Sequence, residues 1–452
     1  MGGGLMQLVA YGAQDIYLTG NPQITFFKVV YRRHTNFSIE SIEQTFNGTA
    51  GFGKKINCAI SRSGDLASSM LLDVTLKMPE TMAAAITVPN ASWAASPFLG
   101  HRLIKYADIE IGGQRIDRHY GEWMHIWSQL VLAESKKTGF EEMIGHKLGV
   151  VATTGATTWK APYNPFGTNG NWYQLVHLQI PLQFWFCRNP GLALPLIALQ
   201  YHDVKIVIEF NDARDCFNEY TTTTTWTTGT SGGPSNLKGS AYIEGASLWV
   251  DYIYLDTDER RRFAQLTHTY LIEQVQHPGE ESCSAGTNNL KLPFNHPVKE
   301  LVWVIQNGTH TASGEWYNYT NTSVVGNPFA PGGSFGLGVT TPVAANFPLN
   351  NCEQASIKLN SQDRISERRG DYFNQTQPYY HHTRIPYTGI NCYSFALRPE
   401  EHQPSGTCNF SRIDNASLYF SARTGSTTIK VFAINYNILR IMSGMAGLAY
   451  SN

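Results

Sequence analysis

The chain has 452 residues, which is too long for one ordinary core and suits two domains of about 200 residues each. It carries 34 Lys and Arg against 35 Asp and Glu, so the net charge is −1 and no basic stretch is present to neutralise many phosphates. This balance argues against direct nucleic-acid binding. Charged residues make up only 15% of the chain and aromatic residues 12%, which is typical of large β proteins with polar, weakly charged surfaces.

The N-terminus has neither the basic region nor the long apolar region of a signal peptide. Gly2 is followed by Met6 where a myristoylation motif needs Ser or Thr, so we interpret residues 2–4 as a flexible arm. No later stretch has the 18 or more uninterrupted apolar residues of a membrane span. The seven cysteines are scattered and include no Cys-x-x-Cys pair, which indicates a reducing compartment.

Residues 107–114 (ADIEIGGQ) recur 248 positions later as residues 355–362 (ASIKLNSQ). Each copy alternates apolar and polar residues and ends in a pair suited to a tight turn, which predicts a strand-turn unit. With one inserted residue, Ile116, Gly121, Glu122 and Trp123 then match Ile365, Gly370, Asp371 and Tyr372. The long period indicates two duplicated domains, because solenoid repeats recur every 20–50 residues or so.

One clear helical stripe is formed by Trp123, Ile126, Trp127, Leu130 and Val131, which recur with the period of a helix. We expect its tryptophans to pack on a sheet and not to bind a ligand.

Other strands are predicted at residues 179–186, 204–210 and 432–438, where apolar and polar residues alternate, and at residues 248–255, which are apolar on nearly both faces. The runs at 248–255 and 432–438 are interpreted as the closing strands of the two halves.

A second, shorter helix is predicted at residues 257–265, where Asp256 and Glu259 have the spacing of a capping box. Residues 260–262 are three arginines, which suit a solvated face or, as an alternative, an anion patch. We place the domain junction here, with an N-terminal arm at 1–30, a first domain at 31–262 and a second at 263–452.

Long loops rich in Thr, Gly, Ser and Asn are predicted at residues 151–171, 221–236 and 308–348. Loops this long are uncommon in compact domains unless they have a function. Many strands, few helices and long loops, all repeated twice, predict an all-β fold of two tandem β-sandwiches.

Several short sequence motifs of enzymes occur in the chain, but the secondary structure predicted around them is not the one that each motif needs. Residues 48–54 match part of a phosphate-binding loop, but Lys55 stands where Ser or Thr should bind magnesium, and a strand is predicted where the motif needs a helix. The two G-x-S-x-G matches, around Ser231 and Ser334, lie in Gly-rich loops without the strand and helix of a nucleophile elbow.

Metal and glycan signals are weak as well. His381 and His382 are adjacent, and neighbours on an extended chain point to opposite sides. Composition alone explains most of the nine Asn-x-Ser/Thr triplets in a chain without a secretory signal. A pair of catalytic carboxylates, as in glycosidases, is neither supported nor excluded, because such pairs cannot be recognised from their spacing in the sequence. We therefore predict no catalytic residue, no cofactor-binding residue and no metal ligand.

Several long blocks closely resemble the major capsid proteins of nucleocytoplasmic large DNA viruses, especially those of algal viruses and their giant-virus relatives. The blocks lie at residues 7–27 (QLVAYGAQDIYLTGNPQITFF), 30–37 (VYRRHTNF), 111–117 (IGGQRID), 190–202 (PGLALPLIALQYH), 295–297 (NHP), 403–415 (QPSGTCNFSRIDN) and 435–445 (NYNILRIMSGM). The resemblance extends over the whole chain. The loops at 221–236 and 308–348 show no fixed pattern.

The resemblance implies a double jelly roll, with two eight-stranded sandwiches side by side, and a structural, non-enzymatic role. It further implies a homotrimer that forms pseudo-hexagonal capsomers of an icosahedral shell over an inner membrane, assembled in the host cytoplasm. Expected partners are other copies of the chain, minor capsid and penton proteins, and inner viral membrane proteins. Residues 1–30 are expected to contact neighbours or minor capsid proteins.

The alternative function is a carbohydrate-binding or carbohydrate-active tandem β-sandwich, since 10 Trp and 23 Tyr offer aromatic faces that suit sugar rings.

Overall fold

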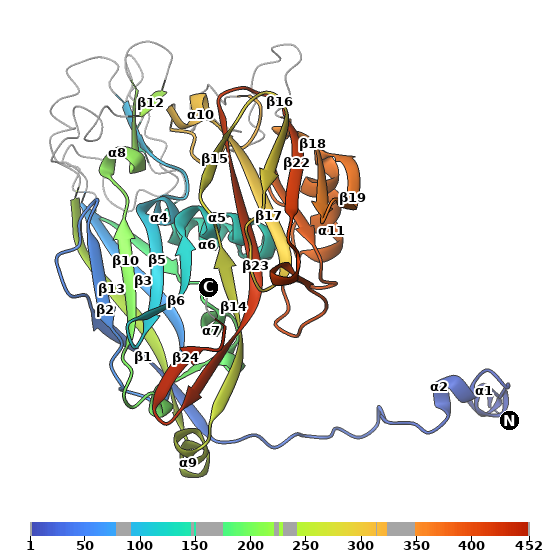
Figure 1. The fold of residues 1–452 in the computed structure, drawn as a ribbon. Coiled ribbons are helices and arrows are strands. Elements are labelled where there is room, and N and C mark those ends of the chain that lie inside the picture. Colours follow the sequence, from blue (N-terminus) through green and yellow to red (C-terminus); the bar gives the residue numbers. More distant parts are fainter. Residues whose placement is uncertain are drawn as a thin grey trace. The chain divides into compact units, whose positions relative to one another are not determined.

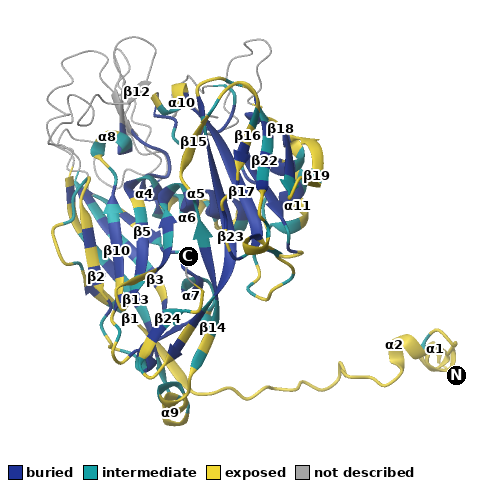
Figure 2. Cartoon of the chain, viewed as in Figure 1, coloured by how far each residue is buried: buried dark blue, intermediate teal, exposed yellow. Residues whose placement is uncertain are grey.

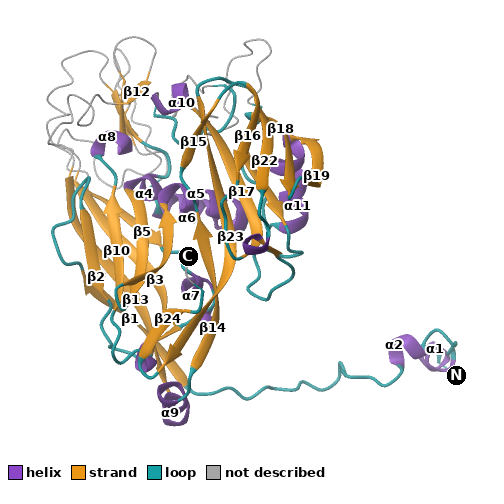
Figure 3. Cartoon of the chain, viewed as in Figure 1, coloured by secondary structure: helices purple, strands orange, loops and turns teal. Residues whose placement is uncertain are grey.

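The computed structural model describes residues 2–77, 92–145, 149–150, 175–220, 226–228, 242–312, 314–322 and 349–450. The chain divides into two compact units, Met1–Phe37 and Ser38–Asn452. Strands dominate the larger unit, as Figure 3 shows. Residues 151–171, most of 221–236 and most of 308–348 lie outside the described residues, and so do Ser231 and Ser334.

The N-terminal unit contains two short helices, α1 (Gly3–Val9) and α2 (Ile16–Thr19). The prediction of a flexible arm at residues 2–4 is wrong for Gly3 and Gly4, which lie in the first turn of α1. Leu, Met and Gln follow them and favour a helix, and the N–H of Ala10 donates to the carbonyl of Met6 at 2.9 Å. Large apolar side chains of this unit are exposed, including Leu8, Tyr17, Leu18, Phe26 and Phe27.

The first half of the larger unit is a sandwich of two antiparallel sheets (Figure 1). One sheet has the order β1 (Phe37–Thr45), β13 (Tyr242–Leu255), β3 (Leu66–Lys77) and β8 (Leu175–Pro181), with the short β9 (Leu194–Pro195) also pairing with β3. The other has the order β2 (Lys55–Ala59), β10 (Val204–Phe210), β5 (Ile104–Ile111) and β6 (Gln114–Tyr120).

The second half repeats this plan. Its first sheet has the order β14 (His268–Gln276), β23 (Thr427–Met442), β17 (Pro297–Asn307) and β20 (Ile390–Ser394), and three short strands extend it: β15 (Glu280–Cys283), β21 (Cys408–Asn409) and β24 (Met445–Leu448). Its second sheet has the order β16 (Gly286–Lys291), β22 (Ala416–Ala422), β18 (Cys352–Leu359) and β19 (Gln362–Arg369).

The strand order is identical in the two halves. Counting the eight sandwich strands of each half along the chain, one sheet has the order 1-8-3-6 and the other the order 2-7-4-5. This alternation between two sheets is the jelly-roll arrangement, so the chain is a double jelly roll. The two halves are called roll 1 and roll 2 below.

Shorter elements connect the sandwich strands. A small third sheet is formed by β4 (Ser92–Ala95), β7 (Gly149–Val150), β11 (Phe217–Tyr220) and β12 (Trp226–Thr228). The helical segments of the larger unit are α4 (Leu99–Leu103), α5 (Gly121–Val131), α6 (Glu134–Met143), α7 (Trp185–Arg188), α8 (Ala213–Cys216), α9 (Thr257–Gln265), α10 (Gly308–Ala312), α11 (Gln377–His381) and the short turns η1 (Pro190–Leu192), η2 (Leu196–Ala198), η3 (Tyr372–Thr376) and η4 (Phe410–Arg412). Figure 1 places β12, α8 and α10 at the same end of the two rolls.

The recurring segments form the same hairpin in each roll, β5–β6 and β18–β19. The turn residues all have positive φ: Gly112 at 59°, Gly113 at 82°, Asn360 at 48° and Ser361 at 64°. Two consecutive positive values are typical of a type I′ turn, whose twist matches that of a hairpin. The predicted strand-turn units are confirmed.

A glycine follows the hairpin at the same place in both rolls because the chain there touches backbone. A Cβ atom on Gly121 would lie 2.2 Å from the carbonyl oxygen of Ile104, and one on Gly370 would lie 1.9 Å from that of Cys352. Ile104 and Cys352 are the first residues of β5 and β18. The shared glycine of the two segments therefore has a packing reason.

Each sandwich encloses its own apolar core (Figure 2). In roll 1, Met70, Leu72 and Val74 of β3 are buried while the residues between them are partly exposed. In roll 2, β22 alternates in the same way. Burial of a side chain of this size contributes about 1.5–3 kcal/mol, so the period-2 patterns account for much of the stability of the two sandwiches.

Most predicted elements are confirmed, but one strand is partly wrong. Residues 204–210, 248–255 and 432–438 lie in β10, β13 and β23. The strand predicted at 179–186 ends at Pro181, and Trp185–Arg188 form the helical turn α7. The N–H of Leu182 still donates to the carbonyl of Met70 in β3 at 2.9 Å, but beyond it Phe184, Trp185 and Phe186 are all buried, which one face of a half-buried strand does not allow.

The helix predicted at 257–265 is α9, with the same bounds. Asp256 caps it by accepting from the N–H of Thr257 at 2.8 Å, so the cap bond goes to the next residue and not to Glu259 as in a capping box. The three arginines at 260–262 are exposed, and Arg260 pairs with Asp65 at 3.0 Å.

Among the described residues, no helix is long and apolar enough to cross a membrane. All seven cysteines are free, so no disulfide links the strands.

Candidate functional site: the joint between the two rolls

Helix α5 of roll 1 lies between the two rolls and packs on the outer face of a roll 2 sheet (Figure 1). Its buried residues Trp123, Ile126, Trp127 and Leu130 form one apolar cluster with residues of β17, β20 and β23: Val302, Val304, Ile390, Cys392, Phe432 and Ile434. The expectation that the tryptophans pack on a sheet is confirmed.

Strand β17 is consequently buried on both faces. Leu301, Trp303 and Ile305 point into the core of roll 2, while the alternate residues Val302 and Val304 face α5. The equivalent strand of roll 1, β3, has one buried face and one that is partly exposed. Among the described residues of the larger unit, the joint therefore covers the roll 2 sheet and leaves the equivalent roll 1 sheet without such a cover.

A second contact is made by β14 and the C-terminal part of β23. Ile272, Leu439 and Ile441 belong to the apolar core of roll 1 although their strands pair within roll 2. The Gln274 amide donates to the carbonyl of Ile116 at 2.5 Å, and the N–H of Val275 donates to the Asp117 carboxylate at 3.1 Å. These strands thus fix roll 2 against roll 1 by both apolar and polar contacts.

A buried ion cluster crosses the joint. Glu273 of β14 pairs with Lys299 of β17 at 2.6 Å and with Arg188 of α7 in roll 1 at 3.0 Å. Burial alone would raise the pKa of Glu273, but His402 at 3.8 Å and the charges of Lys299 and Arg188 lower it to about 2. The carboxylate therefore stays ionised and holds the two cations together.

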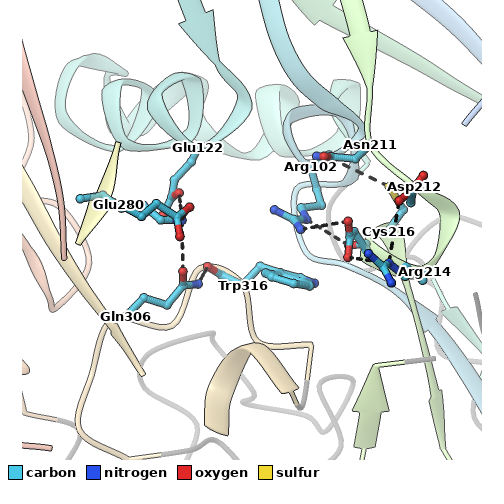
Figure 4. A network of polar contacts seen from close by, with 11 residues as sticks. Arg102, Glu122, Asn211, Asp212, Arg214, Cys216, Glu280, Gln306 and Trp316 are labelled. Carbon is cyan, nitrogen blue, oxygen red and sulfur yellow. Dashed lines mark hydrogen bonds and ion pairs between the residues drawn. The ribbon is translucent and has the colours of Figure 1, made fainter. Parts of the chain in front are cut away.

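Figure 4 shows a further polar network at the N-terminal end of α5. Lys430 of β23 lies 2.6 Å from Glu122 of α5 and 2.9 Å from Glu280 of β15. Burial alone would lower the pKa of Lys430, but the two carboxylates raise it above its ordinary value. The hydroxyl of Tyr319 donates to the same Glu122 at 2.9 Å, so one glutamate of roll 1 holds two groups of roll 2.

Between these contacts is a cavity of about 580 Å³. At its wall, Arg102 stacks on the Trp316 ring at 3.7 Å and donates to the carbonyl of Asp215 at 3.0 Å. Arg118 makes two 2.6 Å bonds to the Asp108 carboxylate. Arg102 and Lys430 contact groups of the other roll, and all three cations have an acceptor within the chain, so these charges are already engaged and are poorly suited to binding an anion.

One cluster of chemistry-bearing side chains was not apparent from spacing. Glu300 of β17, His382 after α11 and Cys392 of β20 are buried, and their ligand atoms lie within 4.8 Å of one another. They are separated by 82 and 10 residues in the chain, so only the pairing of β17 with β20 brings them together. His381 does not belong to this group.

The phosphate-loop candidate lies in a different context. Lys55 begins strand β2, which confirms that a strand stands where the motif needs a helix. Of the Asn-x-Ser/Thr triplets, the asparagines at 307, 318 and 374 are buried, and Asn374 donates to the carbonyl oxygens of Tyr387 and Ile390.

Two family models match the chain along nearly its whole length. The model described as "Major capsid protein N-terminus" matches residues 25–256, and "Large eukaryotic DNA virus major capsid protein" matches residues 259–447. The chain belongs to the major capsid protein family of large eukaryotic DNA viruses.

Curated relatives agree with this assignment. The chain is 48% identical to the major capsid protein of Pyramimonas orientalis virus and 44% identical to that of Phaeocystis pouchetii virus, with both chains covered completely in each case. Among solved structures, the quasi-atomic model of the PBCV-1 virus capsid matches with a TM-score of 0.72 and 37% identity over 95% of this capsid protein and all of that chain. The Faustovirus major capsid protein shares the fold at a TM-score of 0.69 and 14% identity.

These matches confirm the resemblance inferred from sequence. The chain is a structural capsid protein with the double jelly-roll fold.

Proposed function

We propose that this capsid protein forms a head-to-tail homotrimer, in which the α11 side of roll 2 packs on the uncovered sheet of roll 1 in the next chain. Three such contacts would close a ring of six similar rolls, so the trimer would have a pseudo-hexagonal outline and tile an icosahedral shell. The observation that carries the proposal is the unequal burial of two equivalent sheets, one covered by α5 and the other uncovered.

The uncovered sheet of roll 1 has a groove to receive a neighbour. The groove has a volume of about 450 Å³ and is lined by residues of β1, β3, β8 and β13: Ser41, Ser69, Met70, Leu71, Asp73, Gln179, Pro181, Trp249 and Asp251. It lies on the sheet of roll 1 that corresponds to the sheet covered by α5 in roll 2. A neighbour's helix on this groove would repeat, between chains, the packing that exists within the chain.

The surface offered by roll 2 is the α11 patch, which we define as Tyr379, Tyr380 and Leu397. These side chains are 69%, 72% and 74% exposed, although all three are large and apolar or aromatic. Helix α11 occupies in roll 2 the place after the hairpin that α5 occupies in roll 1. Exposed aromatic groups of this kind are typical of protein interfaces.

Ring closure follows from symmetry. A contact between two different surfaces of the same chain is heterologous, and it produces a closed ring when its rotation divides the circle. Two similar rolls in each chain make sixfold packing geometry compatible with threefold symmetry. One protein can then occupy a hexagonal lattice position.

The remaining expectations belong to the same proposal. We infer an arm at residues 1–30 that contacts neighbouring or minor capsid proteins, a first domain at 31–262 and a second at 263–452. The exposed apolar side chains of the N-terminal unit support a role in contacts with other molecules. We further infer assembly in the host cytoplasm, contacts with penton and inner membrane proteins, no enzymatic activity and no direct nucleic-acid binding.

The test is the mass of the full chain in solution, measured by size-exclusion chromatography with light scattering. We expect a species near three times 50.4 kDa. The double variant Tyr379→Asp/Tyr380→Asp and the groove variant Trp249→Lys should each give single chains with an unchanged circular dichroism spectrum. Tyr201→Asp is a matched control, since Tyr201 is 75% exposed but lies outside the α11 patch and the groove.

A wild-type chain that remains monomeric and binds glycans would overturn the trimer and favour the carbohydrate-binding alternative. Trimers that persist in both variants would show that the interface lies elsewhere.

A further inference from the structure

The cluster of Glu300, His382 and Cys392 combines the ligand types that zinc prefers. Glu300 and Cys392 lie on the paired strands β17 and β20, where Cys392 faces Val302 and Glu300 faces Ser394. The two side chains are therefore diagonal neighbours on one face of the sheet. His382 reaches the same face from the end of α11.

The contacts within the cluster are close. The Nε2 atom of His382 lies 2.5 Å from a Glu300 carboxylate oxygen, and the Cys392 thiol lies within 4.8 Å of the ligand atoms of both residues. Ligand atoms around zinc are about 2.0–2.3 Å from the metal and hence roughly 3–4 Å from one another. Because the three ligand atoms lie within 4.8 Å of one another, small side-chain movements are enough to reach that spacing.

The site is shielded from solvent and contains a carboxylate oxygen that accepts no hydrogen bond from the described residues. The side chains of His382 and Glu300 have 0% exposure. Within the described part of the chain, the second Glu300 carboxylate oxygen is buried and has no hydrogen-bond partner. A buried carboxylate oxygen without a partner is costly, and a bound cation would satisfy it.

A second carboxylate orients the histidine. Glu400 lies 2.9 Å from Nδ1 of His382, and it is itself held by the N–H of Thr383 at 2.8 Å and the hydroxyl of Thr383 at 2.5 Å. When a histidine binds zinc through one nitrogen, the other N–H commonly donates to a carboxylate. Because Glu400 engages Nδ1, the nitrogen that would bind the metal is Nε2, which now contacts the Glu300 carboxylate.

Metal binding requires the deprotonated forms of the imidazole nitrogen and the thiol, so a divalent cation would displace one proton from Nε2 of His382 and one from the Cys392 thiol. The two positive charges of the cation would replace those of the two protons, so the net charge of the buried site would not change.

We propose that Glu300, His382 and Cys392 bind one zinc-like divalent cation, with Glu400 as the positioning residue of His382. Thiolate and imidazole ligands favour zinc over calcium or magnesium, which prefer oxygen alone. The ring of Trp127, from α5 of roll 1, lies edge-on to His382 with centroids 6.4 Å apart. The cation would join β17, β20 and the end of α11 directly beneath the joint, independently of whether chains trimerise.

Cobalt is the probe for this site, because thiolate ligation gives Co²⁺ a charge-transfer absorption in the near ultraviolet. The full chain would be refolded with Co²⁺, since a buried site is most readily filled during folding, and then freed of excess metal. We expect one cobalt per chain by elemental analysis, together with the thiolate band. Zn²⁺ should displace the cobalt and abolish the band.

Variants assign the site. Cys392→Ser should lose the band, while Cys352→Ser, which changes an equally buried cysteine outside the cluster, should keep it. Glu400→Gln should keep the band but weaken affinity by about 10–100-fold, as expected for a positioning residue. A wild-type chain that folds in Co²⁺ without the band would overturn the proposal even if no variant folds. A band that survives in Cys392→Ser would overturn it too.

Discussion

Roll 1 and roll 2 have the same strand order, but they use the segment after the β-hairpin differently. In roll 1 this segment is the 11-residue helix α5, which is almost entirely buried and packs its tryptophan face on roll 2. In roll 2 it is the π-helical turn η3 followed by the short α11, which exposes Tyr379 and Tyr380. A duplicated element has thus become an internal joint in one copy and a surface available to another molecule in the other.

The glycines that precede these helical segments, Gly121 and Gly370, have the same structural role in both rolls. Gly121 and Gly370 both bring the chain within contact of the backbone at the start of the preceding hairpin. The difference between the rolls therefore lies in what the helical segment packs on, and not in how it leaves the hairpin.

The largest expected effect separates the two helical segments. Trp123→Ala should lower the free energy of unfolding by about 3–5 kcal/mol, because the side chain is fully buried between Trp127 and Phe432. Tyr380→Ala should change it by less than about 0.5 kcal/mol in single chains, since Tyr380 is 72% exposed. Urea unfolding, at concentrations where light scattering reports single chains, measures both. Equal losses would contradict the contrast between the two helical segments.

The paired glycines should respond alike. Gly121→Ala and Gly370→Ala should each cost about 3 kcal/mol or more, because the new Cβ would lie 2.1 Å and 1.9 Å from a carbonyl oxygen. Gly139→Ala in α6 is the control, since its Cβ would meet no atom within 4 Å, and it should stabilise the helix by up to about 1 kcal/mol. Thermal unfolding of the three variants checks this. Tolerance of alanine in one roll alone would show that the two hairpins are not equivalent.

Acidic pH should destabilise the contact between the two rolls before it destabilises the sandwiches themselves. The pKa of Glu273 is lowered in the folded state from 4.5 to about 2, so its stabilising contribution is complete above about pH 4.5 and is lost as the pH falls toward 2. Each pKa unit corresponds to about 1.4 kcal/mol, so the free energy of unfolding should fall by up to about 3 kcal/mol when Glu273 is protonated.

Arg188→Met removes one of the two cations and should reduce the dependence of stability on pH in this acidic range. Denaturant unfolding of the wild type and the variant, at about pH 6 and about pH 3, would measure the difference. An identical pH dependence would mean that the ion cluster across the joint does not contribute.

The smallest expected effect concerns the two hairpin turns, in which the residue at the second turn position can be exchanged between the rolls. Ser361→Gly should stabilise the chain by about 0.5–1 kcal/mol, because Ser361 has a φ of 64°, a region that is costly for residues with a Cβ. Gly113→Ser should cost about as much, since Gly113 has a φ of 82° and open space around it. Opposite signs in calorimetric melting would confirm equivalent turns, and equal signs would refute them.

Local patterns in the sequence were sufficient for β10, β13, β23, α5, α9 and the two hairpins. Period-2 and period-3.6 apolar spacing is a property of neighbouring residues, so β10, β23 and the stripe of Trp123 and Trp127 could be predicted without knowing their partners. The duplication and the family blocks were also visible in the chain alone. Prediction failed after Pro181, where the alternation continued in the sequence although Phe184, Trp185 and Phe186 are all buried and the chain turns into α7.

Only the tertiary structure decided which faces are covered and which distant residues meet. Glu273 and Arg188 are 85 positions apart and Glu300 and His382 are 82 apart, and no local spacing relates them. Their proximity depends on strand register and on the docking of roll 1 on roll 2. Such contacts are set by long-range packing of two sandwiches, whose geometry depends on the whole apolar surface and not on any short stretch of chain.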